Sequence, residues 1–369
     1  MDYVRSTSPD VLIVPAGQIV PKDLEEFNFK EVIMVVDPAS QHLDWETPEG
    51  TKNHSVTYHD IVKDEVPETE VEIDVDAPAV VICGPRTDDS FEVVEFTHRN
   101  IIAGVAAQNV FLPKKEQYNP SDVFIPVDTL SDLYARIHTY LALLSGSTVA
   151  LNSIAGKNAE LERVVKNVNP TIMVVSAEAI FNTYRSTRGY MMEMWHGIIH
   201  FFQMRTLTRH GKIPQGNFWT RINDYVRPEM GNRLRLVFVA ESGGDRDSQP
   251  LNSLDLADLK IFFKSKVVYG LKHHKVAGPV TQYNMYDYRV QMPEKLPNRN
   301  KGIPRYCAHF GGVTPGVEVK LKDIEKYTAE DKEGPRGLVF VAGPAVAGTG
   351  EKSLGFVGKW LPEGVLSYA

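Results

Sequence analysis

The sequence predicts an α/β fold: mostly parallel sheets flanked by helices, followed by a small C-terminal β unit. Short runs rich in Val and Ile alternate with helical patterns along most of the chain, as they do in βαβ units. Near the C-terminus the pattern changes to alternating strands with Gly-Pro turns. The 369 residues are long enough for two or three packed units.

Six apolar runs are the expected strands of the α/β part. They are short, β-branched and bounded by polar or Pro-containing segments, which is typical of strands buried on both faces. They cover residues 11–14, 31–36, 79–82, 171–175, 234–239 and 266–269. Helical periodicity between them predicts helices near 131–145, 159–167 and 254–263. Residues 317–322 and 337–341 are the strands expected in the C-terminal β unit.

Changes in composition suggest the domain organisation. An acidic, Pro-containing stretch over 64–76 predicts an exposed connector, and residues 291–304 crowd Pro, Lys, Asn and Arg without periodicity. We therefore expect an α/β domain over 1–303, with possible subdivision near 64–76 and 184–233, and a small β subdomain over 304–369.

Charge and targeting signals exclude several function classes. A net charge of −7 gives no basic stripe for nucleic acid, and two distant cysteines fit a reducing compartment. No signal peptide or membrane span is apparent, so we expect a cytoplasmic protein, with an organelle surface as the alternative. The apolar stretch 190–204 is followed by three basic residues, and we expect a core helix rather than a membrane-surface helix.

A series of short segments resembles the AMP-dependent synthetase/ligase superfamily, closest to the long-chain fatty-acid-CoA ligases. Residues 96–103 (FTHRNIIA) resemble the segment that follows the family's phosphate-binding loop. Further matches follow in the family's order along nearly the whole chain. They are 122–129 (DVFIPVDT), 169–173 (NPTIM), 242–244 (SGG), 269–271 (YGL), 315–320 (PGVEVK), 334–337 (GPRG) and 358–364 (GKWLPEG).

The resemblance implies the large domain of an adenylate-forming enzyme, truncated at both ends and without the C-terminal lid domain that carries the catalytic lysine. It also places the vestigial nucleotide site. The positions that align with the family's phosphate, adenine, ribose and magnesium contacts are Glu92, Gly243, Gly244, Tyr269, Gly270, Lys272, His273 and Phe356. Thr129 matches the histidine of the family's Leu-Ala-His loop.

Several of these residues are unsuited to the family's chemistry. Glu92 replaces the lysine of the phosphate loop, Lys272 and His273 replace the Thr-Glu pair that binds phosphate and magnesium, and Phe356 replaces the acid that holds the ribose. An imidazole is a poor magnesium ligand, and a phenyl ring accepts no hydrogen bond. We therefore expect no catalytic residue, no cofactor and no adenylation.

Other chemistry has little support in the sequence. The histidines at 98, 273, 274 and 309 lack the spacing of a zinc site, and no Gly-x-Ser-x-Gly elbow is present, so we expect neither a metal centre nor a serine hydrolase.

Three functions stay open. The first is a noncatalytic binding or scaffold subunit, with a protein partner or a homo-oligomer covering truncated surface. The second is a fatty-acid-CoA ligase, using ATP, magnesium and CoA, that works only with missing parts supplied in trans. The third is an acyl-chain carrier with residues 190–204 lining its groove.

Overall fold

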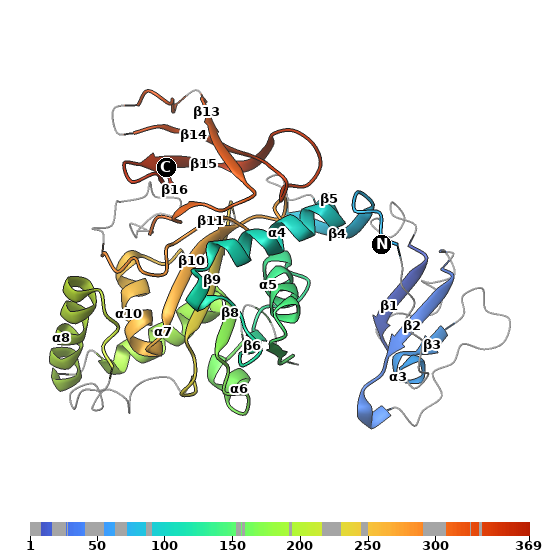
Figure 1. Cartoon of the computed structure of the whole chain (residues 1–369), viewed down its shortest axis with the longest axis horizontal. Helices are drawn as coiled ribbons and strands as arrows, with labels where there is room; N and C mark the ends of the chain where they lie inside the picture. The colour runs from blue at the N-terminus through green and yellow to red at the C-terminus, as the bar shows by residue number, and fades with distance from the viewer. Residues whose placement is uncertain are drawn as a thin grey trace. The chain divides into compact units, whose positions relative to one another are not determined.

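The structure is a computed structural model of the whole chain, and Figure 1 shows its cartoon. Its contacts divide the chain into two compact units, Met1–Glu72 and Ile73–Ala369. The residues described are 9–16, 27, 29–40, 55–62, 72–85, 91–152, 156, 159–191, 194–215, 230–244, 250–290, 308–324, 326–331 and 334–369.

The first unit contains a small parallel sheet in the order β1-β2-β3. Its strands are Val11–Pro15, Glu31–Val35 and Ser55–Thr57, and Val11 pairs opposite Glu31. A 3₁₀ turn (Pro38–Ser40) and the short helix α3 (Tyr58–Ile61) connect and follow these strands. Apolar side chains of Val14, Phe27, Phe29 and Val32 form its own small core. The strands predicted near 11–14 and 31–36 are confirmed.

The second unit is built on a seven-stranded sheet in the order β12-β11-β10-β9-β8-β6-β7. The strands from β7 to β10 run parallel, whereas β11 and β12 are antiparallel additions at one edge. Their bounds are β6 Val123–Pro126, β7 Thr148–Val149, β8 Ile172–Ser176, β9 Leu236–Ser242, β10 Lys266–Lys272, β11 Pro279–Gln282 and β12 Gly312–Val313.

Helices cover both faces of this sheet. On β8 and β9, alternate side chains pack toward different cores, because successive residues of a strand point to opposite faces. Ile172 and Phe238 join the core that contains α5, and Met173 and Val237 join the core that contains α10. The helices are α4 His98–Phe111, α5 Leu133–Leu144, α6 Leu161–Val165, α7 Ala177–Met191, α8 Met194–His210 and α10 Ser253–Phe263; a 3₁₀ turn spans Lys114–Glu116.

Two antiparallel sheets complete the second unit. The C-terminal four-stranded sheet has the order β13-β14-β15-β16, drawn in orange and red in Figure 1. Its strands are Glu318–Lys322, Arg336–Ala342, Lys352–Leu361 and Val365–Tyr368. The predicted C-terminal β unit is thereby confirmed. The other sheet is the hairpin of β4 (Pro78–Pro85) and β5 (Phe91–Thr97). Run 79–82 is therefore a strand, but it is antiparallel and lies outside the parallel sheet.

The segment after β5 is fixed by a capping box. Thr97 accepts a hydrogen bond from the backbone N–H of Asn100, and the Asn100 side chain accepts one from the backbone of Thr97. The Asn100 amide also donates to the carbonyls of Pro344 (2.8 Å) and Val346 (3.1 Å). The segment 96–103 thus starts α4 and anchors residues before β15 to it.

Helix α8 contradicts one prediction. We expected its apolar stretch to lie in the core, but only one side of the helix is buried, through Ile199 and Leu207. Trp195 is 71% exposed and Phe202 is 59% exposed. The prediction failed because apolar residues occur all round this helix, so periodicity alone does not tell which side packs.

Among the described helices, none is long and apolar enough to cross a membrane. Parts of several predictions fall outside the described residues. These parts are the loop at 86–90, most of the acidic stretch at 63–71, residues 216–229 of the expected subdivision, and the expected domain boundary within 291–307.

Candidate functional site at the carboxyl edge of the sheet

Most of the predicted nucleotide positions lie where β9 and β10 end. These strands are parallel and in register, with Ser242 opposite Lys272. The backbone N–H of Gly243 donates to the carbonyl of Lys272 at 2.9 Å, so the Gly243-Gly244 turn and the Lys272-His273 turn lie side by side. Ligands of open α/β sheets bind outside the carboxyl ends of the strands. This edge is therefore the candidate site.

Phe356 fills the space against the glycine turn. It lies on β15 and is only 4% exposed. A Cβ atom placed on Gly243 would come within 2.8 Å of the Phe356 ring, which is closer than ordinary van der Waals contact. The next residue, Gly244, has a φ of +82°, which favours glycine. The ring also packs edge-on against Tyr368, with centroids 5.5 Å apart. The turn that resembles the adenine loop is therefore covered by an aromatic side chain of the same protein.

Tyr269 and Gly270 lie inside β10, where they serve packing. The buried Tyr269 hydroxyl accepts a hydrogen bond from the backbone N–H of Leu251 at 3.3 Å, and its ring lies against Phe310. Gly270 faces β11 so closely that a Cβ atom would lie 2.9 Å from the carbonyl oxygen of Thr281. Glycine at this position allows the two strands to approach.

Lys272 is paired with two carboxylates. Its ammonium lies 3.4 Å from Asp128 and forms a closer contact with Asp132. Burial opposes the charge of the lysine, but the two carboxylates more than offset burial and raise the pKa of Lys272. Burial also raises the pKa of Asp128, although Lys272 opposes that shift. The charge of Lys272 is thus paired within the chain.

His273 is a buried, neutral imidazole. Burial, reinforced by the nearby His274 and Lys275, lowers the pKa of His273 well below its ordinary value. Its Nδ1 accepts a hydrogen bond from the backbone N–H of Lys275 at 3.2 Å, which fixes the turn after β10. The ring packs against that of His274 in a tilted arrangement, with centroids 4.1 Å apart. Its observed role is to shape this turn.

Glu92 connects the β4–β5 hairpin to the same turn. Its carboxylate lies 2.9 Å from the Lys275 ammonium and 3.4 Å from Nε2 of His274. Burial opposes its ionisation, but the hydrogen bond and charge of Lys275 lower the pKa of Glu92. The His274 ring lies so close to Gly84 that a Cβ atom there would be 2.2 Å from it. The end of β4 and the start of β5 are therefore held against the turn after β10.

Sequence reasoning missed four side chains that determine this arrangement, namely Asp128, Asp132, His274 as a contact of Gly84, and Lys275. Asp128 lies within the segment that resembles the Leu-Ala-His loop, where the resemblance points only to Thr129. Asp128 and Asp132 lie 140 or more residues before Lys272, so no local pattern in the sequence indicates that they pair with it. Within the part of the chain that the structure describes, no group of three or more His, Cys, Asp or Glu side chains is placed to hold a metal ion.

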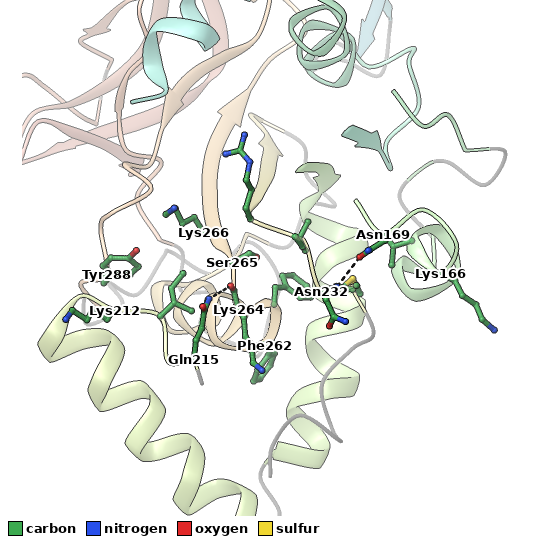
Figure 2. A pocket seen from close by; sticks show the side chains of 17 residues that line it. Lys166, Asn169, Lys212, Gln215, Asn232, Phe262, Lys264, Ser265, Lys266 and Tyr288 are labelled. Atoms are coloured by element: carbon green, nitrogen blue, oxygen red, sulfur yellow. Dashed lines mark hydrogen bonds between the residues drawn. The ribbon is translucent and has the colours of Figure 1, made fainter. Parts of the chain in front are cut away.

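A cavity of about 1110 Å³ lies at the opposite, amino-terminal edge of the sheet (Figure 2). Gln215 donates to the backbone carbonyl of Lys264 at one side of it, and the Asn169 side chain accepts from the backbone N–H of Asn232 at another. Seventeen residues line it, including Phe262 and Tyr288. None of the predicted nucleotide positions is among them.

Comparisons with known proteins agree with this architecture. The chain is 24% identical over 376 residues to the peroxisomal long chain acyl-CoA synthetase 7 of Arabidopsis thaliana, covering 93% of this chain and 48% of that protein. It is 23% identical over 298 residues to the peroxisomal long chain acyl-CoA synthetase 6 of the same organism, covering 74% and 38%. The chain thus spans less than half the length of the curated relatives it matches.

The fold is similar to that of a putative long-chain-fatty-acid CoA ligase from Rhodopseudomonas palustris. The two share a TM-score of 0.62 at 13% identity, over 99% of this chain and 75% of that structure. No protein-family model matches the sequence. The resembling segments occur in the family's order, and most strands of the large sheet are parallel. Both observations agree with the similarity in sequence and fold to these proteins. The chain is a homologue of the long-chain acyl-CoA synthetases and has the α/β fold of the adenylate-forming ligases.

Proposed function

We propose that this protein is a catalytically inactive acyl-CoA-synthetase-like protein that acts as a binding or scaffold subunit. The proposal rests on one observation: side chains of the same protein fill the edge of the sheet where the nucleotide positions are predicted. Phe356 covers the glycine turn, Lys272 is bound by Asp128 and Asp132, and Glu92 is bound by Lys275.

Acyl adenylation makes three demands that this edge does not meet. The triphosphate needs cations and backbone N–H groups, magnesium needs carboxylate oxygens, and the ribose needs a hydrogen-bond acceptor. At the aligned positions, Lys272 already has two carboxylate partners, His273 is neutral, and Phe356 offers no acceptor. Nucleotide entry would separate buried ion pairs and displace a buried ring, which costs several kcal/mol.

Exposed apolar side chains support the proposal that the protein binds a partner. Near the edge strand β7, Leu143 and Leu144 at the end of α5 and Leu151 after β7 are 59%, 74% and 70% exposed. Contiguous exposed apolar surface is typical of interaction sites. We propose a protein partner or a second copy here. Affinity purification from the native cell, with and without substitution of these leucines by Ser, tests this part of the proposal.

The test of inactivity is pyrophosphate release. The purified chain is incubated with ATP, magnesium, CoA and fatty acids of short, medium and long chain, beside an active long-chain acyl-CoA synthetase as control. We expect no release above a heat-denatured sample at any chain length. Release that depends on a fatty acid would contradict the proposal and favour the ligase alternative.

Two further assignments belong to the proposal. We propose that the protein needs no ATP, magnesium or CoA for its role, and that it is located in the cytoplasm or at an organelle surface. Cell fractionation tests the second assignment, and recovery inside a sealed organelle would contradict it. The carrier alternative has less support, because Trp195, Ile198 and Phe202 of the expected groove lining are exposed.

A further inference from the structure

The outward side of α8 is an exposed stripe that changes from apolar to cationic along the helix. Residues 195, 198, 202, 205 and 209 follow the three- and four-residue spacing that aligns side chains on one face. Trp195, Ile198 and Phe202 form the first half, and Phe201 flanks them; all four are 49% to 71% exposed. Arg205 and Arg209 form the second half and are exposed.

The orientation of the helix is fixed from its inner side. Ile199 and Leu207 are buried, and Nε2 of His200 lies 2.8 Å from the Asp258 carboxylate on α10. The His200 ring also packs near Phe262 of α10. Figure 1 shows α8 at the outer edge of the second unit, beside α10. Rotation of the stripe toward the core would break these contacts, so the stripe faces outward.

The charge around the stripe favours one kind of surface. Helix α8 contains no Asp or Glu, and Lys212 follows Arg205 and Arg209 two residues after its end. The whole chain carries −7, so this cationic end differs in sign from the protein's net charge. Aromatic side chains beside arginines are the pattern of helices that lie in a membrane interface, where rings enter the acyl boundary and cations meet anionic headgroups.

We propose that the outward stripe of α8 docks the protein on an anionic lipid surface. Trp195, Ile198 and Phe202 enter the interface, and Arg205 and Arg209 contact lipid phosphates and carboxylates. The overall negative charge repels the rest of the protein from the same surface, so docking selects one orientation. This inference goes beyond the proposed function and does not depend on nucleotide, so failure of either leaves the other standing.

The test is cosedimentation of the full chain with phosphatidylcholine vesicles, with and without phosphatidylserine. We expect binding only when phosphatidylserine is present, and weaker binding as salt rises. Substitution of Phe201 and Phe202 by Ser lowers the partition coefficient about tenfold or more because it removes the inserted apolar area. The matched control replaces Ile102 and Val110, two exposed apolar side chains on α4, by Ser and leaves partition unchanged.

The cationic half of the stripe is tested by the double substitution Arg205→Gln and Arg209→Gln. Each arginine contributes about a fivefold factor at such a surface, so the pair lowers partition about 25-fold. The control, Lys114→Gln with Lys326→Gln, changes two exposed lysines, has the same net charge and retains binding. Circular dichroism establishes that every variant is folded.

Three results would overturn the proposal. The first is equal binding to vesicles with and without phosphatidylserine. The second is equal loss of binding in the control variants. The third is absence of vesicle binding together with a dimer that the Phe201/Phe202 variant abolishes in light scattering, because the stripe would then be covered by a second copy.

Discussion

The two edges of the parallel sheet differ in what fills the space beside the strand ends. At the carboxyl edge, where α/β enzymes bind ligands, Phe356 lies on Gly243 and Lys272 is held by two carboxylates. At the amino edge, Asp122 and Arg235 hold the strand starts together, yet a large cavity lies beside them. The filled edge is the one where the resemblance predicts the nucleotide positions, and none of those positions lines the cavity at the other edge.

This difference shows that fold and site depend on different residues. The buried apolar faces of β8 and β9 keep the sheet intact, whereas nucleotide binding requires open space and unpaired charge at the strand ends. A chain can therefore keep the first and fill the second. Four substitutions test how much the side chains at each edge contribute to the stability of the fold.

Asp122→Ala has the largest expected effect, because it breaks the amino edge. Asp122 accepts hydrogen bonds from Arg235 at 2.7 and 2.9 Å and from Thr171 at 2.8 Å, which joins β6, β8 and β9. Its loss leaves the partly buried Arg235 without its main partner and lowers the free energy of unfolding by about 5 kcal/mol at pH 7. Urea unfolding followed by circular dichroism measures it, with the exposed Glu330→Ala as a control within about 0.5 kcal/mol.

The pH dependence of this effect has a definite sign. Burial opposes ionisation, but the hydrogen bonds from Arg235 and Thr171 more than offset it and lower the pKa of Asp122 below its ordinary 3.8. The stabilisation is therefore present above that value and disappears as the pH falls below it. A difference between wild type and Asp122→Ala that grows as the pH falls would contradict this assignment.

Phe356→Ala tests whether the covered carboxyl edge is a packed core. Removal of a buried phenyl ring leaves a cavity beside Gly243 and Tyr368 and lowers the free energy of unfolding by about 4 kcal/mol. Phe91→Ala, at a 76% exposed ring, is the matched control with almost no loss. We expect no gain of nucleotide binding, because Lys272 keeps its carboxylate partners. An unchanged stability would show that the ring does not close the site.

Lys272→Met leaves Asp128 and Asp132 without their shared cation. The free energy of unfolding falls by about 3 kcal/mol at pH 7. The loss shrinks as the pH falls toward 4, because burial already raises the pKa of Asp128 and protonation removes the unpaired charge. In the wild type, the raised pKa of Lys272 keeps its contribution present until strongly alkaline pH. Lys326→Met serves as the exposed control, and equal losses in both variants would contradict the pairing.

Glu92→Gln has the smallest expected effect. The carboxylate is one-third exposed, so solvent screens its pairing with Lys275 and the free energy of unfolding falls by less than about 1 kcal/mol. Hydrogen exchange is the more direct measurement, since release of the β4–β5 hairpin from the turn speeds exchange of the β5 amides. Glu95→Gln, at an exposed position on the same strand, is the control, and identical exchange in both variants would contradict the contact.

The sequence predicted the architecture better than the site. Strands such as β8 and β9 are apolar on both faces, and this pattern determines a buried strand locally. The position of Phe356 was found from the resemblance, but its contact with Gly243 depends on how the C-terminal sheet folds over the strand ends. The partners of Lys272 come from a loop 140 or more residues earlier, and such pairing is decided by tertiary structure.

Helix α8 shows the limit of periodicity. Ile199 and Leu207 form one apolar stripe, and Trp195, Ile198 and Phe202 form a second. A helix with two apolar sides has no preferred inner side until a neighbour is known. The contact of His200 with Asp258 decides which side faces α10.

Titration calorimetry of ATP and AMP with magnesium, on the purified chain at near-physiological salt, tests the central claim most directly. The occupied carboxyl edge predicts no heat of binding even at high nucleotide concentration, with an active long-chain acyl-CoA synthetase as the positive control. Micromolar binding that Phe356→Ala or Lys272→Met alters would show that the edge still admits nucleotide, and it would contradict the account.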